Sequence, residues 1–196
     1  MRITWITTMV LTVAGAHGKP PVPVTERRVP VCIEEADPHV DPMAVRGAEL
    51  AASQMFAEIG VTIEWSRTMG RCQPQAIRIF LGLDTPATLR PGAMAYALPF
   101  EGTHIRVFYD RIAQGRGRRI LEGVLAHVFA HEIGHILQAQ SRHSEEGIMK
   151  ARWCGRDFAD MGWKPLRFTD GDVTLIYAGL AKRAESATMP AETGSR

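Results

Sequence analysis

The stretch from Arg118 to Gln138 constrains the fold of this 196-residue chain more than any other. It contains no proline, and its large apolar residues recur at helical spacing: Leu121, Val124, Leu125, Val128, Phe129, Ile133, Ile136 and Leu137. Because these residues surround most of the circumference of the helix that they predict, the helix must be buried. We therefore expect the rest of the domain to pack around it.

The first 16 residues have the composition of a secretory signal peptide. A basic residue, Arg2, precedes an apolar run over residues 3–13, and Ala14 and Ala16 supply the small residues that signal peptidase requires. The apolar run is much shorter than the ~20 residues of a membrane-spanning helix. We predict cleavage after Ala16, a secreted mature chain (periplasmic or extracellular) and no stable membrane anchor.

Export would allow disulfide bonds, so the three cysteines are read in that context. An odd number permits at most one bond within the chain. We favour a bond between Cys32 and Cys72, because Cys32 falls in the first predicted strand and Cys72 lies close to the next one. Three buried thiols are the alternative. Neither residue forms a close-spaced pair with Cys154, which argues against a zinc site made of cysteines.

The order of predicted elements indicates one domain over residues 29–183, after an extended leader at residues 17–28 and before a disordered tail at residues 184–196. Period-two patterns and Gly/Pro turns predict five strands, at residues 29–36, 61–65, 76–83, 92–98 and 103–109. Helical spacing predicts three long helices, at residues 43–59, 118–138 and 173–183, the last capped by Thr169 or Asp170.

The charge of the chain is small, because 23 basic residues face 21 acidic ones and leave a formal net charge of +2. Such a balance gives no indication of a polyanionic partner, so no nucleic acid is expected. Arg111, Arg116, Arg118 and Arg119 cluster before the buried helix, and we interpret them as a solvated loop, with an acidic substrate as the alternative.

A His-Glu-x-x-His motif occupies residues 131–135 of the buried helix. Residues four apart share one helix face, so His131 and His135 can each direct an imidazole nitrogen at one zinc ion. Glu132 lies about 100° further round the axis, where it can reach a zinc-bound water without replacing it. A chain of this composition contains the motif by chance in only roughly 2% of cases. The motif therefore favours a metal site over a pair of core histidines.

A catalytic zinc ion usually has three protein ligands and one open position. We expect His143 to be the third ligand, since a loop could fold it back beneath the metal. Glu145 and Glu146 are the alternatives, although a carboxylate ligand usually comes from a following helix and none is predicted there. The turn at residues 147–149 ends in Met149, which is either an apolar floor under the ligands or an ordinary buried methionine.

These residues together resemble the metzincin clan of zinc endopeptidases, in the histidine motif, the His143-Ser144 pair and the Gly147-Ile148-Met149 turn. The likeness is greatest to matrixin-type members and to secreted bacterial metalloproteases akin to them. It extends upstream to residues 93–99 and 104–108, which are similar to the edge strand and its neighbour in matrixins. The resemblance implies a zincin-like α+β fold: a mixed, twisted five-stranded sheet, two long helices including the active-site helix, a Met-turn and a C-terminal helix.

One departure from the family pattern concerns the third ligand. In metzincins it usually stands six residues after the second histidine, with a glycine between them that lets the chain turn. Here His143 stands eight residues after His135, and Gln138 occupies the glycine position. Either the loop is longer or the helix continues further.

The resemblance implies a secreted zinc-dependent endopeptidase, a monomer with one catalytic Zn²⁺ bound by His131, His135 and His143. Glu132 would be the general base for the zinc-activated water, and a protein or peptide substrate would pair with the edge strand at residues 92–98. A catalytically silent zinc-binding module and a zinc hydrolase of a non-peptide substrate are the alternatives. Trp153 either lines the pocket or belongs to the core, and we expect His127 to be a packed, hydrogen-bonded histidine.

Overall fold

The computed structural model of the chain describes residues 27–67, 72–86, 89, 92–98, 101 and 103–188. The predicted signal peptide, most of the leader and the last eight residues of the predicted tail lie outside these described residues.

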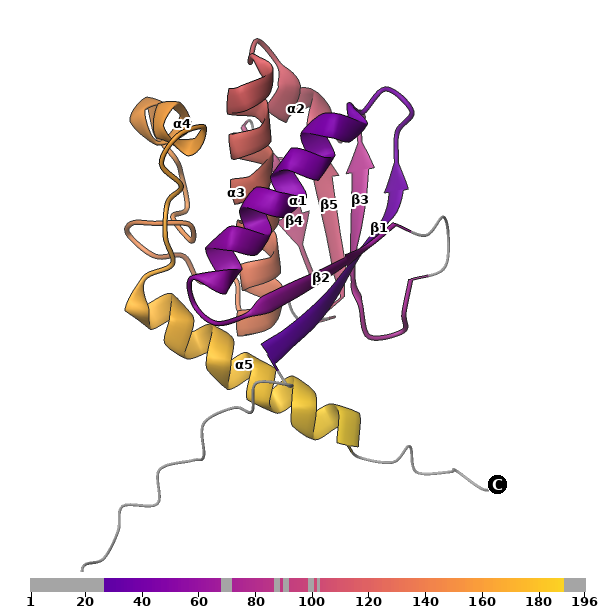
Figure 1. Cartoon of the computed structure of the whole chain (residues 1–196), viewed down its shortest axis with the longest axis vertical. Helices are drawn as coiled ribbons and strands as arrows, with labels where there is room; N and C mark the ends of the chain where they lie inside the picture. Colours follow the sequence, from indigo (N-terminus) through magenta and orange to yellow (C-terminus); the bar gives the residue numbers. More distant parts are fainter. Residues whose placement is uncertain are drawn as a thin grey trace, which may run out of the picture.

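The described residues form an α+β fold around a mixed five-stranded sheet, with strand order β2-β1-β3-β5-β4 (Figure 1). The four parallel strands are β1 (Arg28–Ala36), β2 (Thr62–Ser66), β3 (Ile77–Gly82) and β5 (His104–Phe108). The short strand β4 (Ala95–Ala97) is antiparallel to β5 and forms one edge of the sheet. The predicted strands are thus present, but the strand expected over residues 92–98 is reduced to three residues.

Two long helices, α1 (Pro42–Ala57) and α3 (Arg118–Gln138), lie side by side and pack against the sheet (Figure 1). Asp41 caps the start of α1, where its carboxylate accepts hydrogen bonds from the N–H groups of Met43 and Ala44. Both helices lie close to their predicted positions. Helix α5 (Asp170–Thr188) packs across the C-terminal end of α3.

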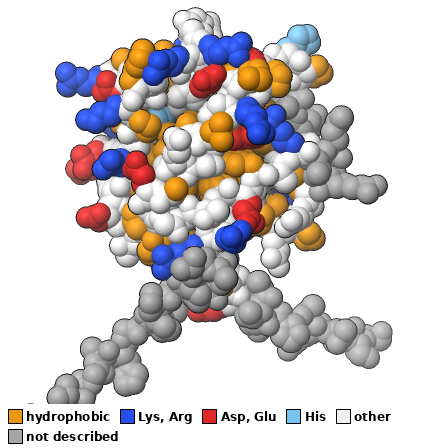
Figure 2. Space-filling model, in the orientation of Figure 1, with side chains coloured by type: hydrophobic (Ala, Val, Ile, Leu, Met, Phe, Trp, Pro, Cys, Tyr) orange, Lys and Arg blue, Asp and Glu red, His pale blue; other side chains and the backbone are white. Residues whose placement is uncertain are grey.

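Helix α3 is the centre of the core, as its apolar circumference predicts. Every residue from Gly123 to Gln138 is buried. Among the described helices it is the one long and apolar enough to cross a membrane, but 89% of its most apolar window is buried inside the domain. Its composition is therefore explained by burial in protein. On the face shown in Figure 2, acidic and basic side chains are interspersed, as the small net charge suggests.

Three helical features differ from the sequence expectation. Helices α2 (Tyr109–Ala113) and α4 (Gly155–Met161) are short and were not predicted, because five to seven residues carry too little periodicity to reveal a helix. Helix α5 begins three residues before the predicted start and continues five residues past Arg183, so residues 184–188 are helical rather than disordered. Contacts with the body of the domain support this longer helix: the Tyr177 hydroxyl donates to the carbonyl of Ile59, and Arg183 donates to that of Gln75.

The predicted disulfide between Cys32 and Cys72 is confirmed, and Cys154 is a free, exposed cysteine. Cys32 lies in β1 with its side chain fully buried. The bond joins this central strand to the segment that leads into β3, its neighbour in the sheet.

We expect reduction of this bond to destabilise the domain substantially. It connects residues 40 apart in the sequence, and a loop of that length corresponds to a stabilisation of about 4 kcal/mol by chain-entropy arguments. Urea unfolding with and without reductant measures the loss, and thiol titration of the denatured, non-reduced chain should find the single thiol of Cys154. Three titratable thiols, or equal stability with and without reductant, would contradict the bond.

Candidate metal centre

His131 and His135 lie on successive turns of α3, and backbone carbonyls fix the orientation of both rings. The Nδ1 atom of His131 is 2.8 Å from the carbonyl oxygen of Ile148, and that of His135 is 2.9 Å from the carbonyl oxygen of Gln140. Because a carbonyl can only accept, each Nδ1 must carry the proton. Each Nε2 is therefore left with a lone pair, as a metal ligand requires.

The two Nε2 atoms face each other at 3.0 Å. Two lone pairs at this distance repel, and burial opposes relief by protonation: it lowers the pKa of His131 to about 3 and that of His135 to about 4. A bound cation would resolve the conflict, and zinc–nitrogen bonds of about 2.0–2.1 Å allow both nitrogens to reach one ion. The donor set thus fits a zinc ion.

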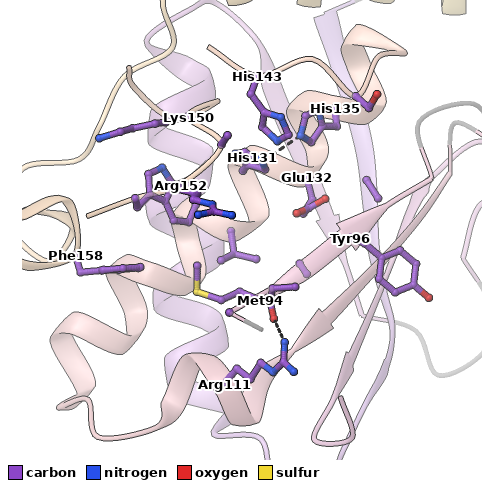
Figure 3. Close-up of a pocket in the computed structure, with 18 of the residues that line it drawn as sticks. Met94, Tyr96, Arg111, His131, Glu132, His135, His143, Lys150, Arg152 and Phe158 are labelled. Atoms are coloured by element: carbon purple, nitrogen blue, oxygen red, sulfur yellow. Dashed lines mark hydrogen bonds between the residues drawn. The ribbon is translucent and has the colours of Figure 1, made fainter. Parts of the chain in front are cut away.

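His143 joins this pair, as predicted for the third ligand. The potential ligand atoms of His131, His135 and His143 all lie within 4.8 Å of one another. His143 is exposed whereas the other two are buried, so the cluster lies at the boundary between the core and solvent. Among the described residues, Glu145 and Glu146 do not take part in the cluster. The structure therefore brings together three histidines and leaves both carboxylate alternatives outside (Figure 3).

The loop, rather than the helix, accommodates the longer spacing between His135 and His143. Helix α3 ends at Gln138, and Ala139 turns the chain with left-handed backbone angles (φ 51°, ψ 38°). The N–H of Gln140 donates to the carbonyl of His135, and that of Ala139 donates to the carbonyl of Ile136, which is the Schellman pattern. The turn that glycine makes in metzincins thus occurs one residue later than the sequence comparison places it. It also delivers the Gln140 carbonyl to the His135 ring.

Ala139 is the only described non-glycine residue with positive φ, and we expect Ala139→Gly to stabilise the protein. The left-handed conformation costs an L-residue about 1 kcal/mol, which glycine avoids at the price of greater freedom in the unfolded chain. The net gain should be about 0.5 kcal/mol, measured as a higher urea midpoint. Gly171→Ala is the matched reverse change within α5. A lower midpoint for Ala139→Gly would contradict the strain argument.

Met149 lies directly behind the two buried histidines. A Cβ atom built on Gly134 would be 2.6 Å from the Met149 sulfur, so the missing side chain at Gly134 lets the methionine approach the helix. Gly147 forms the preceding turn with φ 75°, and a Cβ there would be 2.3 Å from the Arg167 carbonyl oxygen. The structure therefore places Met149, fully buried, as the apolar floor expected of it.

A buried carboxylate, Asp172, connects the histidine loop to α5. Its side chain is completely buried and accepts hydrogen bonds from the Ser144 hydroxyl and from the N–H and hydroxyl groups of Thr169, with Arg142 at 3.5 Å. The Thr169 hydroxyl in turn accepts from the Asp172 N–H, which completes a capping box at the start of α5. Since Ser144 follows His143 directly, this network fixes the loop that carries the third histidine.

Glu132 points toward the same cavity from the next position on α3 (Figure 3). Burial raises the pKa of its carboxyl group to about 8, and a hydrogen bond from the backbone of Ala97 in β4 opposes the shift. A carboxyl group in these surroundings can gain and lose a proton near neutral pH. The sequence prediction of a general base beside the metal ligands therefore has a suitable side chain in a suitable place.

His127 is a structural histidine, as expected. Its Nδ1 is 2.6 Å from the carbonyl of Gly123, its Nε2 accepts from the N–H of Leu166 at 2.9 Å, and burial lowers its pKa to about 4. Trp153 does both things considered for it: it packs edge-on against His127 and His131, and it lines the cavity in front of the histidines.

The cavity extends along the open edge of β4 and has a volume of about 1020 Å³. Because Met94, Tyr96 and Leu98 direct their backbone groups toward β5, those of Ala95 and Ala97 point to the unpaired edge. The Ala97 N–H meets Glu132, so Ala95 presents both an N–H and a carbonyl toward the cavity. Sequence analysis anticipated the edge strand, but not which of its residues is available.

Comparisons with known proteins support the fold. No protein-family model matches the sequence, and a search of curated proteins finds no match either. Among solved structures, the fold is similar to the crystal structure of archaemetzincin from Methanopyrus kandleri, with a TM-score of 0.53 and 14% sequence identity over 79% of this chain and 97% of that one. The predicted zincin-like α+β fold is thus confirmed. The likeness at this identity is one of fold, and the matrixin-type resemblance stays a prediction.

Proposed function

We propose that the chain is an exported zinc-dependent endopeptidase. The observation that carries this proposal is the joint placement of the three histidines, a buried Glu132 and an open strand edge around one cavity. The name of the archaemetzincin neighbour, which shares this fold, supports the metzincin assignment. The Cys32–Cys72 bond supports export, because such bonds persist in oxidising compartments.

The substrate would bind as an added strand. A peptide backbone pairs with Ala95 along the open edge of β4, and its next residues pass the histidine cluster. A zinc ion held by His131, His135 and His143 would polarise the scissile carbonyl and acidify a bound water. Glu132 would accept the proton from that water and later donate it to the leaving amine, a role suited to its raised pKa.

Cleavage of a mixed peptide library tests the proposal. We expect the zinc-loaded chain to cut internal peptide bonds, a chelator to abolish the cutting and added zinc to restore it. Cleavage that survives complete removal of the metal would contradict the proposal. So would a chain that contains one zinc ion and cuts no peptide, since its site would then serve binding alone.

A further inference from the structure

The walls of the cavity are basic. Four cationic side chains line it, those of Arg111, Arg116, Lys150 and Arg152, against one carboxyl group, that of Glu132. Lys150 is neutralised by Asp157, whose carboxylate is 2.8 Å from the ammonium group. In the described part of the chain, neither Arg116 nor Arg152 has a carboxylate partner. These two guanidinium groups therefore leave the cavity with uncompensated positive charge.

Arg116 is held in place by partners that do not neutralise it. Its Nη1 atom donates to the carbonyls of Arg111 and Ile112, at 3.0 and 2.6 Å. Its guanidinium group also lies over the ring of Phe158, 5.2 Å from the ring centroid. A guanidinium group fixed in this way loses little side-chain entropy when an anion binds. The solvated loop expected from the sequence is thus, at Arg116, part of the cavity wall.

Arg152 approaches from the opposite wall, three residues after Met149. Its guanidinium group points into the cavity, between His131 and Met94, whereas Lys150 points away from the histidines (Figure 3). The side chain is exposed and has no ion-pair or hydrogen-bond partner among the described residues. It is therefore available to a bound ligand.

The surface between the two arginines is apolar. Met94, Val128, Trp153 and Phe158 line the cavity beside them. The methylene groups of a glutamate side chain can pack on such a surface while the carboxylate reaches a guanidinium group, and nearby apolar walls strengthen that attraction. A lysine or arginine side chain would instead meet like charge. The cavity thus combines shape for an aliphatic stem with charge for a carboxylate.

We propose that this endopeptidase selects peptides with a glutamate or aspartate side chain next to the cleaved bond, and that Arg116 and Arg152 determine this specificity. The inference deepens the proposed function and rests on it. The chemistry recognised is a carboxylate on a peptide side chain, as distinct from the carboxylate at a peptide C-terminus.

Matched peptides test the proposal. Each pair differs only by glutamate or glutamine at one position, and all C-termini are amidated so that no terminal carboxylate can bind. Binding to the zinc-loaded Glu132→Gln protein is followed by fluorescence anisotropy, and cleavage by the wild-type protein is followed separately. We expect a glutamate peptide to bind about tenfold more tightly than its glutamine partner, and this ratio to fall between about 0.05 and about 0.5 M salt.

Variants then assign the preference to residues. Arg152→Gln and Arg116→Gln should each reduce the ratio about threefold, and the double variant should bring it close to one. Arg152→Lys should retain part of the preference, because it keeps the charge. Arg156→Gln, an exposed arginine of α4 outside the cavity, is the matched control and should keep the full ratio.

Two results would overturn the proposal: equal binding of the glutamate and glutamine peptides, or an unchanged preference in the folded double variant. A preference that appears only when the C-terminus is left free would also overturn it. Failure of the endopeptidase proposal is distinguishable, because it would appear as absent cleavage with the binding preference still present. Cleavage without any preference would overturn this inference alone.

Discussion

Replacing Glu132 with glutamine is expected to lower the rate of peptide cleavage by about a thousandfold while leaving the zinc content unchanged. Glutamine has nearly the same shape as glutamate but cannot accept and return the proton of the attacking water, and loss of a general base typically costs between about 10²- and 10⁴-fold. The histidines keep their own hydrogen bonds to Ile148 and Gln140 in this variant, so metal binding should persist.

Cleavage rates and metal content measured on the same preparation give the two readouts. Glu146→Gln is the control, since this carboxylate is exposed and lies outside the histidine cluster. A Glu132→Gln protein with full zinc content and wild-type cleavage would remove Glu132 from the mechanism.

Replacing Gly179 with alanine should have the largest effect on stability. Helices α3 and α5 approach so closely here that a Cβ atom would be 1.6 Å from the carbonyl oxygen of Leu137. Backbone cannot move aside as a flexible side chain can, so the helices must separate. We expect a loss of about 3 kcal/mol or more in the free energy of unfolding, the upper range for overpacking. Leu137 is two residues from His135, so metal affinity should fall as well.

Urea unfolding measures this loss directly. Gly171→Ala in the same helix is the matched control, because the nearest atom to its added Cβ is the Thr169 hydroxyl oxygen at 3.8 Å. Alanine favours helix over glycine, so this control should be neutral or stabilising. Equal midpoints for the two variants would show that α3 and α5 do not approach as closely as described.

Local patterns carried most of what could be predicted from the sequence. The buried helix announces itself by apolar residues all round, and the i, i+4 histidines follow from helix geometry alone. His143 was also predictable, because few side chains after the helix could bind zinc. The disulfide depended on a single assumption about which strands are neighbours, and β1 and β3 are indeed paired.

The features that could not be predicted depend on contacts between distant segments. Nothing near Asp172 indicates that its carboxylate holds Ser144 in the histidine loop, since the two residues are 28 apart in the sequence. The left-handed turn at Ala139 lacks the usual glycine signal. Arg116 resembles any loop arginine until α2 and Phe158 position it against the cavity.

The most direct test of the account is the zinc content of the purified chain after saturation with zinc and removal of the excess. We predict one zinc ion per wild-type chain and a much lower content in His143→Ala, which loses one of the three converging ligands. A wild-type chain that retains no zinc, or a His143→Ala chain that retains as much as the wild type, would contradict the three-histidine metal centre.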